Sequence, residues 1–337
     1  MISLSKMAVW IPEEFEDAAY IAKEAGLPEF VVEEKMGIKK KCRAKKNVNT
    51  STMAINAAKE VLKDIDPNSI DMIIWTGSEF KDHPVWSAGI YVQEQIGAYN
   101  AWAFDLSARC SSNVVGLKVA KAMMEQDSSL KRVLLCGGHK TGELVNYKDE
   151  SSRFLYNLSD GGAAILLERG DFNPLLESSV ITDGAFSKDV IIPAGGTVMP
   201  WSDKAEDYCL TCPDIAGMRV RLAERSIDNF LKVIKGAATA SMPNQPIDYL
   251  SLLHMKKSAH DEILSRLELE QEQSIYLNEY GHFGAPDQVL SLGLAEEFLK
   301  PGSHVVLASA GIGYTWSAIS LRWDQKTFSL IKGDRNE

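Results

Sequence analysis

Cys110 is the residue best suited to chemistry, because it stands where an apolar strand expected over Ala101 to Ser107 runs into a turn of small residues and an amphipathic helix. At a helix N-terminus, the dipole and the free N–H groups stabilise a thiolate and lower the pKa of a thiol from about 8.5. The position therefore predicts a nucleophile. The alternative is a cysteine that only packs as a small apolar side chain, and the rest of the sequence must separate the two.

Two histidines of the second half could assist such a nucleophile, which needs a base or a hydrogen-bond donor beside it. His254 ends an apolar strand expected over Tyr249 to Leu253, and α/β proteins commonly place their sites at the carboxyl ends of parallel strands. His282 lies in a glycine-flanked turn before a helix expected from Asp287 to Phe298. Either histidine alone could be an ordinary partly buried side chain, but two at such positions favour a site.

The segment from Leu307 to Trp316 offers backbone donors for a developing negative charge. It starts as an apolar strand and breaks into the turn Ala-Gly-Ile-Gly. Such a turn can present successive N–H groups to an oxyanion, although a turn that only reverses the chain has the same composition.

Composition and charge exclude several classes of protein. Of the 337 residues, 45% are hydrophobic and 24% are charged, as in globular proteins and unlike disordered or membrane proteins. No apolar run approaches the about 18 residues that a membrane span needs, and the acidic N-terminal region lacks the basic start of a signal peptide. We therefore expect a cytoplasmic protein, and its odd number of cysteines, five, agrees with a reducing compartment. A net charge of −10 argues against nucleic acid as a partner.

One local stretch is basic in this acidic chain, with seven Lys and Arg residues between Lys35 and Lys46. Such a run is usually a solvated surface loop. It could also receive the phosphates of a cofactor or bind an acidic carrier protein.

A Cys-x-x-Cys motif at Cys209 and Cys212 resembles half of a zinc site. A structural zinc ion needs four ligands, and no second pair with fitting spacing follows. We expect two loop thiols and no metal.

The order of elements predicts an α/β protein with buried sheets, because apolar strands alternate with amphipathic helices. A helix is expected over Thr52 to Leu62, with Met53, Ala54, Ala57, Ala58 and Val61 on one face. Strands are expected over Met72–Gly77, Arg132–Gly138 and Gly161–Leu167, and the polar segment from about Asp189 to Arg219 reads as a surface connection.

The chain also repeats itself. Ile70–Ile74 resembles Ile247–Leu253, since each opens with Ile-Asp onto an apolar strand, and Lys131–Gly138 resembles Ser303–Gly311. The order is the same in both halves. A duplicated chain would pack two similar sheet-containing halves together, with a site in the seam between them.

Four motifs together resemble a known family. They are Asp-Leu-Ser-Ala-Arg-Cys-Ser-Ser around Cys110, His-Met-Lys-Lys from His254, Tyr-Gly-His-Phe-Gly-Ala around His282 and Ala-Ser-Ala-Gly-Ile-Gly-Tyr-Thr-Trp from Ala308. In sequence and order they look like the thiolase-fold condensing enzymes, most closely 3-oxoacyl-[acyl-carrier-protein] synthase III. The resemblance runs nearly end to end and includes Phe154 to Ala163.

The resemblance implies a fold and an assembly. The fold is a five-layered αβαβα arrangement of two duplicated halves, which we place at residues 1–170, with the nucleophilic cysteine, and 171–337, with both histidines and the glycine-rich oxyanion turn. The family usually forms a homodimer, and we expect the strand around Ala101 to Ser107 in the interface. A strand that leads to the nucleophile would otherwise leave an open edge.

The resemblance also implies roles for single residues. Cys110 would take the acyl group from an acyl-CoA or acyl-carrier-protein thioester, with no permanently bound cofactor. His254 and His282 would bind the thioester carbonyl of a malonyl extender and promote its decarboxylation, and the N–H groups of Cys110 and Ile312 would form the oxyanion hole. The phosphates of coenzyme A or the carrier protein would meet Lys35, Lys256 and Lys257.

Several positions depart from the family pattern. Position 282 is typically asparagine in the synthase III group and is histidine here. Val31 stands about where a tryptophan stacks on adenine, Lys35 replaces an arginine, Lys257 replaces an asparagine, and Arg109 replaces a small residue. These changes suggest a specialised lipid or secondary-metabolite pathway, polyketides included, instead of the initiation of fatty acid biosynthesis.

Three functions follow as hypotheses. The first is acyl transfer to Cys110 followed by decarboxylative Claisen condensation to a 3-oxoacyl product. The second is an acyltransferase that passes the Cys110-bound acyl group to an alcohol or amine. The third, a non-catalytic subunit of a condensing heterodimer, is disfavoured because such a partner typically loses its cysteine.

Overall fold

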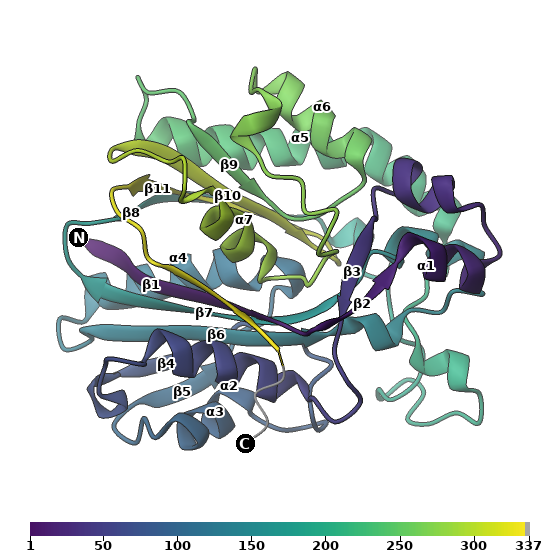
Figure 1. Cartoon of the computed structure of the whole chain (residues 1–337), viewed down its shortest axis with the longest axis horizontal. Helices are drawn as coiled ribbons and strands as arrows, with labels where there is room; N and C mark the ends of the chain where they lie inside the picture. Colours follow the sequence, from purple (N-terminus) through teal and green to yellow (C-terminus); the bar gives the residue numbers. More distant parts are fainter. Residues whose placement is uncertain (334–337) are drawn as a thin grey trace.

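Two β-sheets with helices between and outside them form the architecture of the computed structural model, which describes residues 1–333 (Figure 1). The first sheet has the strand order β12-β1-β7-β6-β4-β5. In chain order its strands are β1 (Ile2–Ile11), β4 (Met72–Trp75), β5 (Trp102–Asp105), β6 (Arg132–Lys140), β7 (Asp160–Arg169) and β12 (Phe328–Lys332). The inner strands are buried on both faces, which explains their nearly continuous apolar sequences.

The second sheet repeats the arrangement of the first. Its order is β8-β11-β10-β9, formed by β8 (Leu175–Thr182), β9 (Tyr249–Leu252), β10 (Ser303–Gly311) and β11 (Thr315–Trp323). In both sheets two antiparallel pairings are followed by one parallel pairing: β1-β7-β6-β4 in the first, β8-β11-β10-β9 in the second. The repeated sequences occupy β4 with β9 and β6 with β10, so the predicted duplication is confirmed. Strand β12 returns from the C-terminal region to pair with β1, and the division at residue 170 stays a prediction.

Helices complete five layers, as predicted. Helices α2 (Thr50–Val61) and α3 (Ala88–Ile96) cover the outer face of the first sheet, α4 (Ser112–Gln126) and α7 (Asp287–Ala295) lie between the sheets, and α5 (Ile215–Ser241) and α6 (Lys257–Arg266) cover the second sheet (Figure 1). A small two-stranded antiparallel sheet of β2 (Glu14–Asp17) and β3 (Lys40–Arg43) lies to one side with α1 (Ala18–Ala25), which connects the two strands. Within residues 1–333, no helix is both long enough and apolar enough to cross a membrane.

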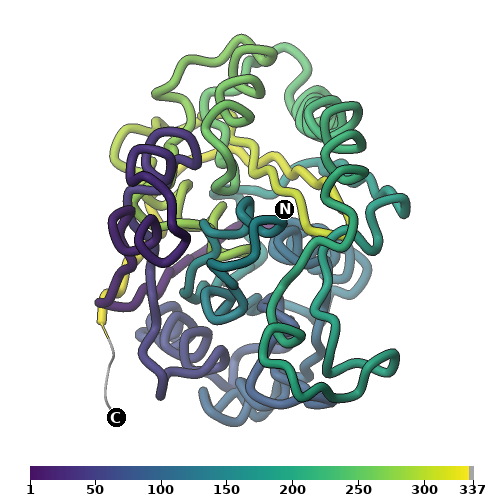
Figure 2. The backbone as a smooth tube through the Cα atoms, turned by 90° about the vertical axis from the view of Figure 1, so that its right-hand side faces the viewer, coloured from purple at the N-terminus to yellow at the C-terminus, as the bar shows by residue number. Residues whose placement is uncertain are grey.

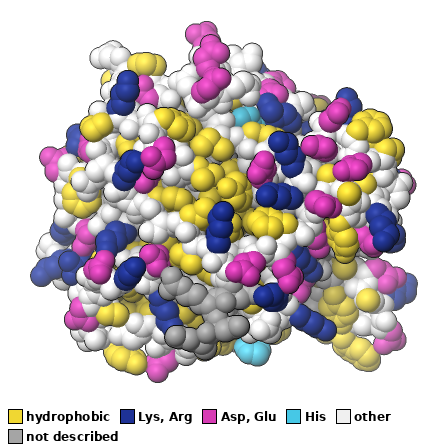
Figure 3. Space-filling view, in the orientation of Figure 1, with side chains coloured by type: hydrophobic (Ala, Val, Ile, Leu, Met, Phe, Trp, Pro, Cys, Tyr) yellow, Lys and Arg dark blue, Asp and Glu magenta, His cyan; other side chains and the backbone are white. Residues whose placement is uncertain are grey.

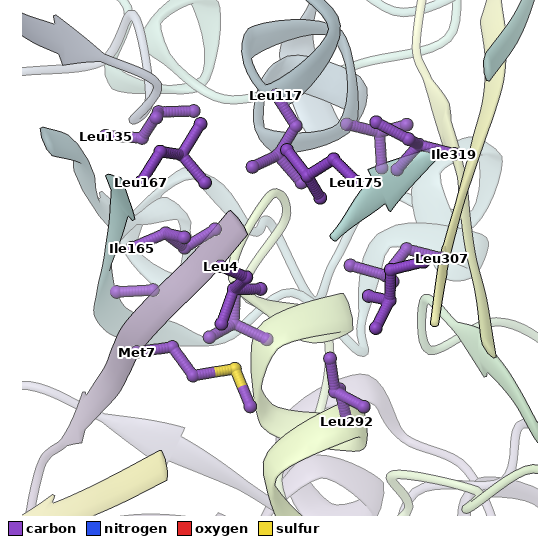
Figure 4. Packing of buried hydrophobic residues seen from close by; sticks show 14 of the residues in the cluster. Leu4, Met7, Leu117, Leu135, Ile165, Leu167, Leu175, Leu292, Leu307 and Ile319 are labelled. Atoms are coloured by element: carbon purple, nitrogen blue, oxygen red, sulfur yellow. The ribbon is translucent and has the colours of Figure 1, made fainter. Parts of the chain in front are cut away.

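The central helices fill the space between the sheets with side chains that reach both. Leu117 of α4 packs between Leu135 and Leu167 of the first sheet and Ile319 of the second, and Leu292 of α7 joins the same cluster (Figure 4). All but one of the residues of α7 are buried, as expected for a helix that is covered on every side. This packing fixes the N-termini of α4 and α7, where Cys110 and His282 lie close by.

The predicted elements need small changes of boundary. Helix α2 starts two residues earlier than expected, and its five predicted apolar residues are all buried. Strand β6 continues two residues further, to Lys140, and α7 ends at Ala295 instead of Phe298. The segment after Asp189 is mostly irregular and runs outside the layers (Figure 2), but its last residues belong to α5, which starts at Ile215 because Asp214 caps it.

The basic stretch is not a solvated loop throughout, and that interpretation is wrong for Lys41. Its side chain is fully buried, donates to Leu158 O at 2.8 Å and pairs with Glu16 at 3.3 Å. Burial lowers the pKa of Lys41 to about 8. Arg43 pairs with Glu16 and with Asp160, so Lys41 and Arg43 of β3 form structural ion pairs within the fold. Acidic and basic side chains are interspersed over the face in Figure 3.

The Cys-x-x-Cys motif consists of two free thiols. Cys209 is partly exposed, whereas Cys212 is buried with its sulfur 3.7 Å from that of Met218. Within residues 1–333, no group of three or more His, Cys, Asp or Glu side chains could hold a metal ion.

Candidate active site

Cys110 lies in a short 3₁₀ turn, Arg109–Ser111, that leads from β5 into α4. Ser112 fixes this turn, because its hydroxyl donates to Arg109 O at 2.7 Å and accepts from Ala108 N at 3.0 Å. The cysteine is partly exposed. The thiol therefore stands two residues before the first residue of α4, close to the predicted position at a helix N-terminus.

The turn between β10 and β11 is held against the Cys110 turn. Ser111 donates to Thr315 O at 2.8 Å, and a Cβ atom on Gly311 would lie 2.2 Å from Ala108 O, so only glycine allows this approach. Ile312, in that turn, lines the same cavity as Cys110. The structure thus brings together the two segments whose N–H groups were expected to form an oxyanion hole, and that role stays a prediction.

His282 reaches the nucleophile. Its Nε2 lies 3.2 Å from Cys110 Sγ. The main chain on both sides bonds to a neighbouring segment, since His282 N donates to Asn157 O at 2.7 Å and Ser159 N donates to His282 O at 2.9 Å. Gly281, at φ +77°, permits the tight turn that delivers the imidazole, because a side chain there would meet Lys41 and Asn157.

Asp287, which the sequence showed only as a helix start, ties both histidines together. The carboxylate is fully buried; Oδ2 accepts from His282 Nδ1 at 2.6 Å and from His254 N at 2.8 Å, and Oδ1 accepts from Phe283 N at 2.8 Å. Burial by itself lowers the pKa of His282. The charges of Asp287 and Cys110 and their hydrogen bonds outweigh burial and raise that pKa well above its ordinary value.

His254 is also buried, but its ring nitrogens are engaged differently. Nδ1 lies 3.0 Å from Asn157 Nδ2 and Nε2 lies 3.2 Å from Gly37 O. Since the amide NH₂ of Asn157 can only donate, Nδ1 is the acceptor and the ring proton is on Nε2. Burial, only partly offset by Asp287, lowers the pKa of His254 to about 4, so this imidazole is neutral at pH 7.

His139, at the end of β6, is a third buried histidine that the sequence analysis did not single out. It lines the cavity with Cys110, and its Nε2 has no hydrogen-bond partner among the described residues. The ring packs so closely on Gly284 that a Cβ there would lie 2.7 Å from it. Burial and the charge of His282 lower the pKa of His139 to about 3. A histidine at the end of an apolar strand was the available signal.

A largely apolar cavity of about 570 Å³ opens in front of Cys110. His139, His254 and His282 line it, and so do Lys35, Lys256 and Val31. Lys257 is placed elsewhere: its ammonium bonds to Asp261 and, at 3.1 Å, to Gln271. Arg109, beside the nucleophile, pairs with Glu79 at the cavity wall. The cavity can hold an acyl chain near the thiol and a longer donor near the lysines.

Comparisons with known proteins identify the class. The model of the family 3-oxoacyl-[acyl-carrier-protein (ACP)] synthase III matches residues 104–184, and the model of its C-terminal part matches residues 237–323. Together these ranges contain Cys110, both predicted catalytic histidines and the β10–β11 turn.

Curated relatives and solved structures agree. The chain is 28% identical to the beta-ketoacyl-[acyl-carrier-protein] synthase III of Clostridioides difficile (strain 630), over 93% of this chain and 96% of the relative. It superposes on the crystal structure of 3-oxoacyl-(acyl carrier protein) synthase III from Pseudomonas aeruginosa PAO1 with a TM-score of 0.82 and 21% identity, covering 96% and 98% of the two chains. The chain also superposes on the crystal structure of the priming β-ketosynthase from the R1128 polyketide biosynthetic pathway with a TM-score of 0.82 and 16% identity, covering 96% of this chain and 97% of that one.

The fold and the site define a thiolase-fold condensing enzyme. Within that class the chain is a 3-oxoacyl-[acyl-carrier-protein] synthase III-like protein, as the sequence motifs predicted. The coarse function follows: it is a transferase of the condensing type.

Proposed function

We propose that the chain transfers an acyl group to Cys110 and condenses it with a malonyl thioester, with loss of carbon dioxide, to give a 3-oxoacyl product. The observation that carries the proposal is the 3.2 Å contact between Cys110 Sγ and His282 Nε2 at the wall of a largely apolar cavity. The departures from the family pattern at Val31, Arg109 and His282 support a specialised lipid or polyketide pathway.

In the first half-reaction, His282 Nε2 holds the proton that leaves Cys110 Sγ. The thiolate attacks the thioester carbonyl of the donor, and the N–H groups of Cys110 and Ile312 receive the oxyanion. The carbon–sulfur bond of the donor breaks, its sulfur takes the proton from His282, and the acyl group stays on Cys110.

In the second half-reaction, the malonyl thioester loses carbon dioxide and becomes an enolate. His254 carries its ring proton on Nε2, so this atom can donate to the enolate oxygen in place of Gly37 O. His282, which gave its Nε2 proton to the departing donor sulfur, takes one proton from solvent and then donates from Nε2. The enolate carbon then attacks the acyl carbonyl, and Cys110 leaves as a thiolate beside the protonated His282.

The donor enters past the two lysines of the cavity wall. Lys35 and Lys256 suit the phosphates of coenzyme A or of a carrier-protein arm, which would be a substrate and not a resident cofactor. Lys257 is withdrawn from this role by its bond to Asp261. We assign phosphate contacts to Lys35 and Lys256.

Intact-protein mass spectrometry with a panel of acyl-CoA and acyl-carrier donors tests the proposal. We expect one acyl adduct in the native protein and in the control Cys209→Ala, and none in Cys110→Ala. Addition of malonyl thioester should then release carbon dioxide and remove the adduct. An adduct that persists in Cys110→Ala contradicts the nucleophile, and no adduct with any donor supports a non-catalytic partner.

A specific observation favours a second function, acyl transfer from Cys110 to an alcohol or amine. Because Asp287 accepts the Nδ1 proton, neutral His282 has its lone pair on Nε2, beside the thiol. That is the form a base needs to deprotonate an acceptor, and the Cys–His–Asp order is the order of acyl-transferring triads. Loss of the adduct to a hydroxyl or amine acceptor without release of carbon dioxide would establish this function instead.

We also propose a homodimer. Strand β5 forms one edge of the first sheet, and Trp102 on it is 48% exposed. A free edge with exposed apolar side chains invites pairing with another chain. Light scattering should give twice the chain mass, and Trp102→Asp should lower it; a monomer at working concentration contradicts the proposal.

A further inference from the structure

Asp287 has a place in the site that neither its sequence position nor the family comparison assigns. It is the first residue of α7 and is fully buried. Its carboxylate accepts three hydrogen bonds, from His282 Nδ1, His254 N and Phe283 N, all between 2.6 and 2.8 Å. Hydrogen bonds to an ionised acceptor are short and strong, and a buried carboxylate needs such donors.

The three bonds have different consequences for the two histidines. Asp287 holds His254 only through its main-chain N–H, two residues after β9 ends, and forms no hydrogen bond with the ring. His282 is held through ring atom Nδ1, and this bond decides the ring's tautomer. With Nδ1–H donated to Asp287, any proton exchanged with Cys110 must move to or from Nε2.

The groups that face His282 come from four elements. They are Cys110 from the turn before α4, Asp287 from α7, His139 from the end of β6 and His254 from the end of β9. His139 and His254 are buried and neutral at pH 7, so Asp287 and Cys110, which lie on the two ring nitrogens, are the groups that raise the pKa of His282.

We propose that Asp287 is a positioning residue that orients His282 through Nδ1 and keeps the Cys110–His282 pair as thiolate and imidazolium before any substrate binds. The proton moves from Cys110 Sγ to His282 Nε2, and no other bond changes. The proposal rests on Cys110 being the acyl-carrying residue of the proposed function, but its test requires no acyl donor.

Asp287→Asn removes the charge with little change of shape. The amide can still accept from Phe283 N through its oxygen, whereas its NH₂ can no longer accept from His254 N, can only donate to His282 Nδ1 and forces the proton onto Nε2. Nε2 is then a neutral donor and can no longer take the thiol proton. An opposite charge at this distance shifts a titration by about 1–3 pH units, so the thiolate should form at correspondingly higher pH.

The experiment is alkylation of Cys110 by iodoacetamide as a function of pH, read by mass spectrometry. We expect the native protein to react rapidly at pH 6–7, and Asp287→Asn to react at least about tenfold more slowly there, with its inflection moved upward by about 1–3 pH units. The control is Asp160→Asn. Asp160 is a fully buried carboxylate that accepts from Ala44 N and Gly142 N at 2.9 Å and pairs with Arg43, and within residues 1–333 it has no hydrogen bond to a histidine. Its variant should keep the native profile.

A folded Asp287→Asn with the native alkylation profile overturns the proposal. If Asp287→Asn does not fold, ¹⁵N NMR of the native protein labelled at histidine decides instead. We expect both ring nitrogens of His282 to be protonated at pH 7, and a neutral ring there overturns the proposal. If the native protein is alkylated rapidly at pH 6–7 and Asp287→Asn shows the upward shift, but no donor acylates Cys110, the proposed function is refuted and the role of Asp287 remains.

Discussion

The end of β9 and the turn before α7 each place a buried histidine in the same cavity, yet the surroundings shift their pKa values in opposite directions. The ring nitrogens of His254 have neutral partners, Asn157 and Gly37 O, and burial lowers its pKa to about 4. His282 has a carboxylate on one nitrogen and the thiol on the other, and its pKa is raised well above the ordinary value. Burial is common to both, so the partners of the ring nitrogens decide the charge of each histidine.

The difference suits two tasks. A neutral imidazole with its proton on Nε2 is a fixed donor, suited to an oxyanion or an enolate oxygen. An imidazole that gains and loses a proton at Nε2 is suited to exchange it with a thiol. We therefore expect His282 to act in both half-reactions and His254 only where charge develops on the extender.

The largest expected effect comes from His282→Ala. Loss of the group that exchanges a proton with Cys110 should lower the rate of acylation by about 10²–10⁴-fold, the usual range for a positioned acid–base group. Stopped-flow or quenched-flow formation of the acyl adduct measures this step. Unchanged acylation would show that the 3.2 Å contact has no role in forming the nucleophile.

His254→Ala should affect only the second half-reaction. We expect acylation within about twofold of the native rate and release of carbon dioxide from the malonyl thioester slowed by about 10–10³-fold, because one enolate donor is lost. Measuring the rate of adduct formation and the rate of carbon dioxide release on the same variant separates the two steps. An equal loss in both would place His254 beside the thiol, and no loss in either would favour the acyltransferase function.

These roles were only partly predictable from the sequence. Cys110 and His282 stand at boundaries that glycine and small residues mark, so composition and order locate them. Asn157 and Asp287 act through contacts between residues that lie far apart in the chain and that the fold brings together. Asn157 lies 97 residues from His254, and Asp287 lies 33 residues from it. No local pattern reports such contacts, although an acidic residue five positions after a turn histidine was visible.

The fold was more predictable than the site. Apolar strands and the Ile-Asp repeat indicated two similar sheets because buried parallel strands leave long apolar runs. The return of β12 to pair with β1, and the burial of Lys41 within a basic run, depend on which strands become neighbours. Charge patterning alone favours a solvated surface, and tertiary ion pairs override it here.

Asn157→Asp sharpens the comparison by giving His254 a carboxylate like that of His282. The new carboxylate would accept from Nδ1, so the ring would carry protons on both nitrogens more readily. We expect the pKa of His254 to rise by about 1–3 units from its native value of about 4. Histidine NMR titration measures it, with Asn157→Leu as a control that adds no charge. A pKa that stays near the native value would mean that burial dominates over the partner.

The smallest effect concerns stability in acid. The pKa of His254 is lowered to about 4, and an unfolded histidine titrates near 6.5, so the unfolded chain binds the proton more readily between these values. Neutral His254 therefore favours folding above about pH 6.5, and this contribution is lost as the pH falls toward 4, by at most about 3 kcal/mol. His282 has a raised pKa, so its contribution to stability changes with pH in the opposite direction, but His282 is present in all the proteins compared.

The test is the free energy of unfolding from urea titrations between pH 7 and 5. We expect His254→Gln to lose less of it over this range than the native protein, and His83→Gln, at an exposed position, to match the native protein. An identical acid dependence in His254→Gln would contradict a buried, neutral His254 and remove the contrast with His282.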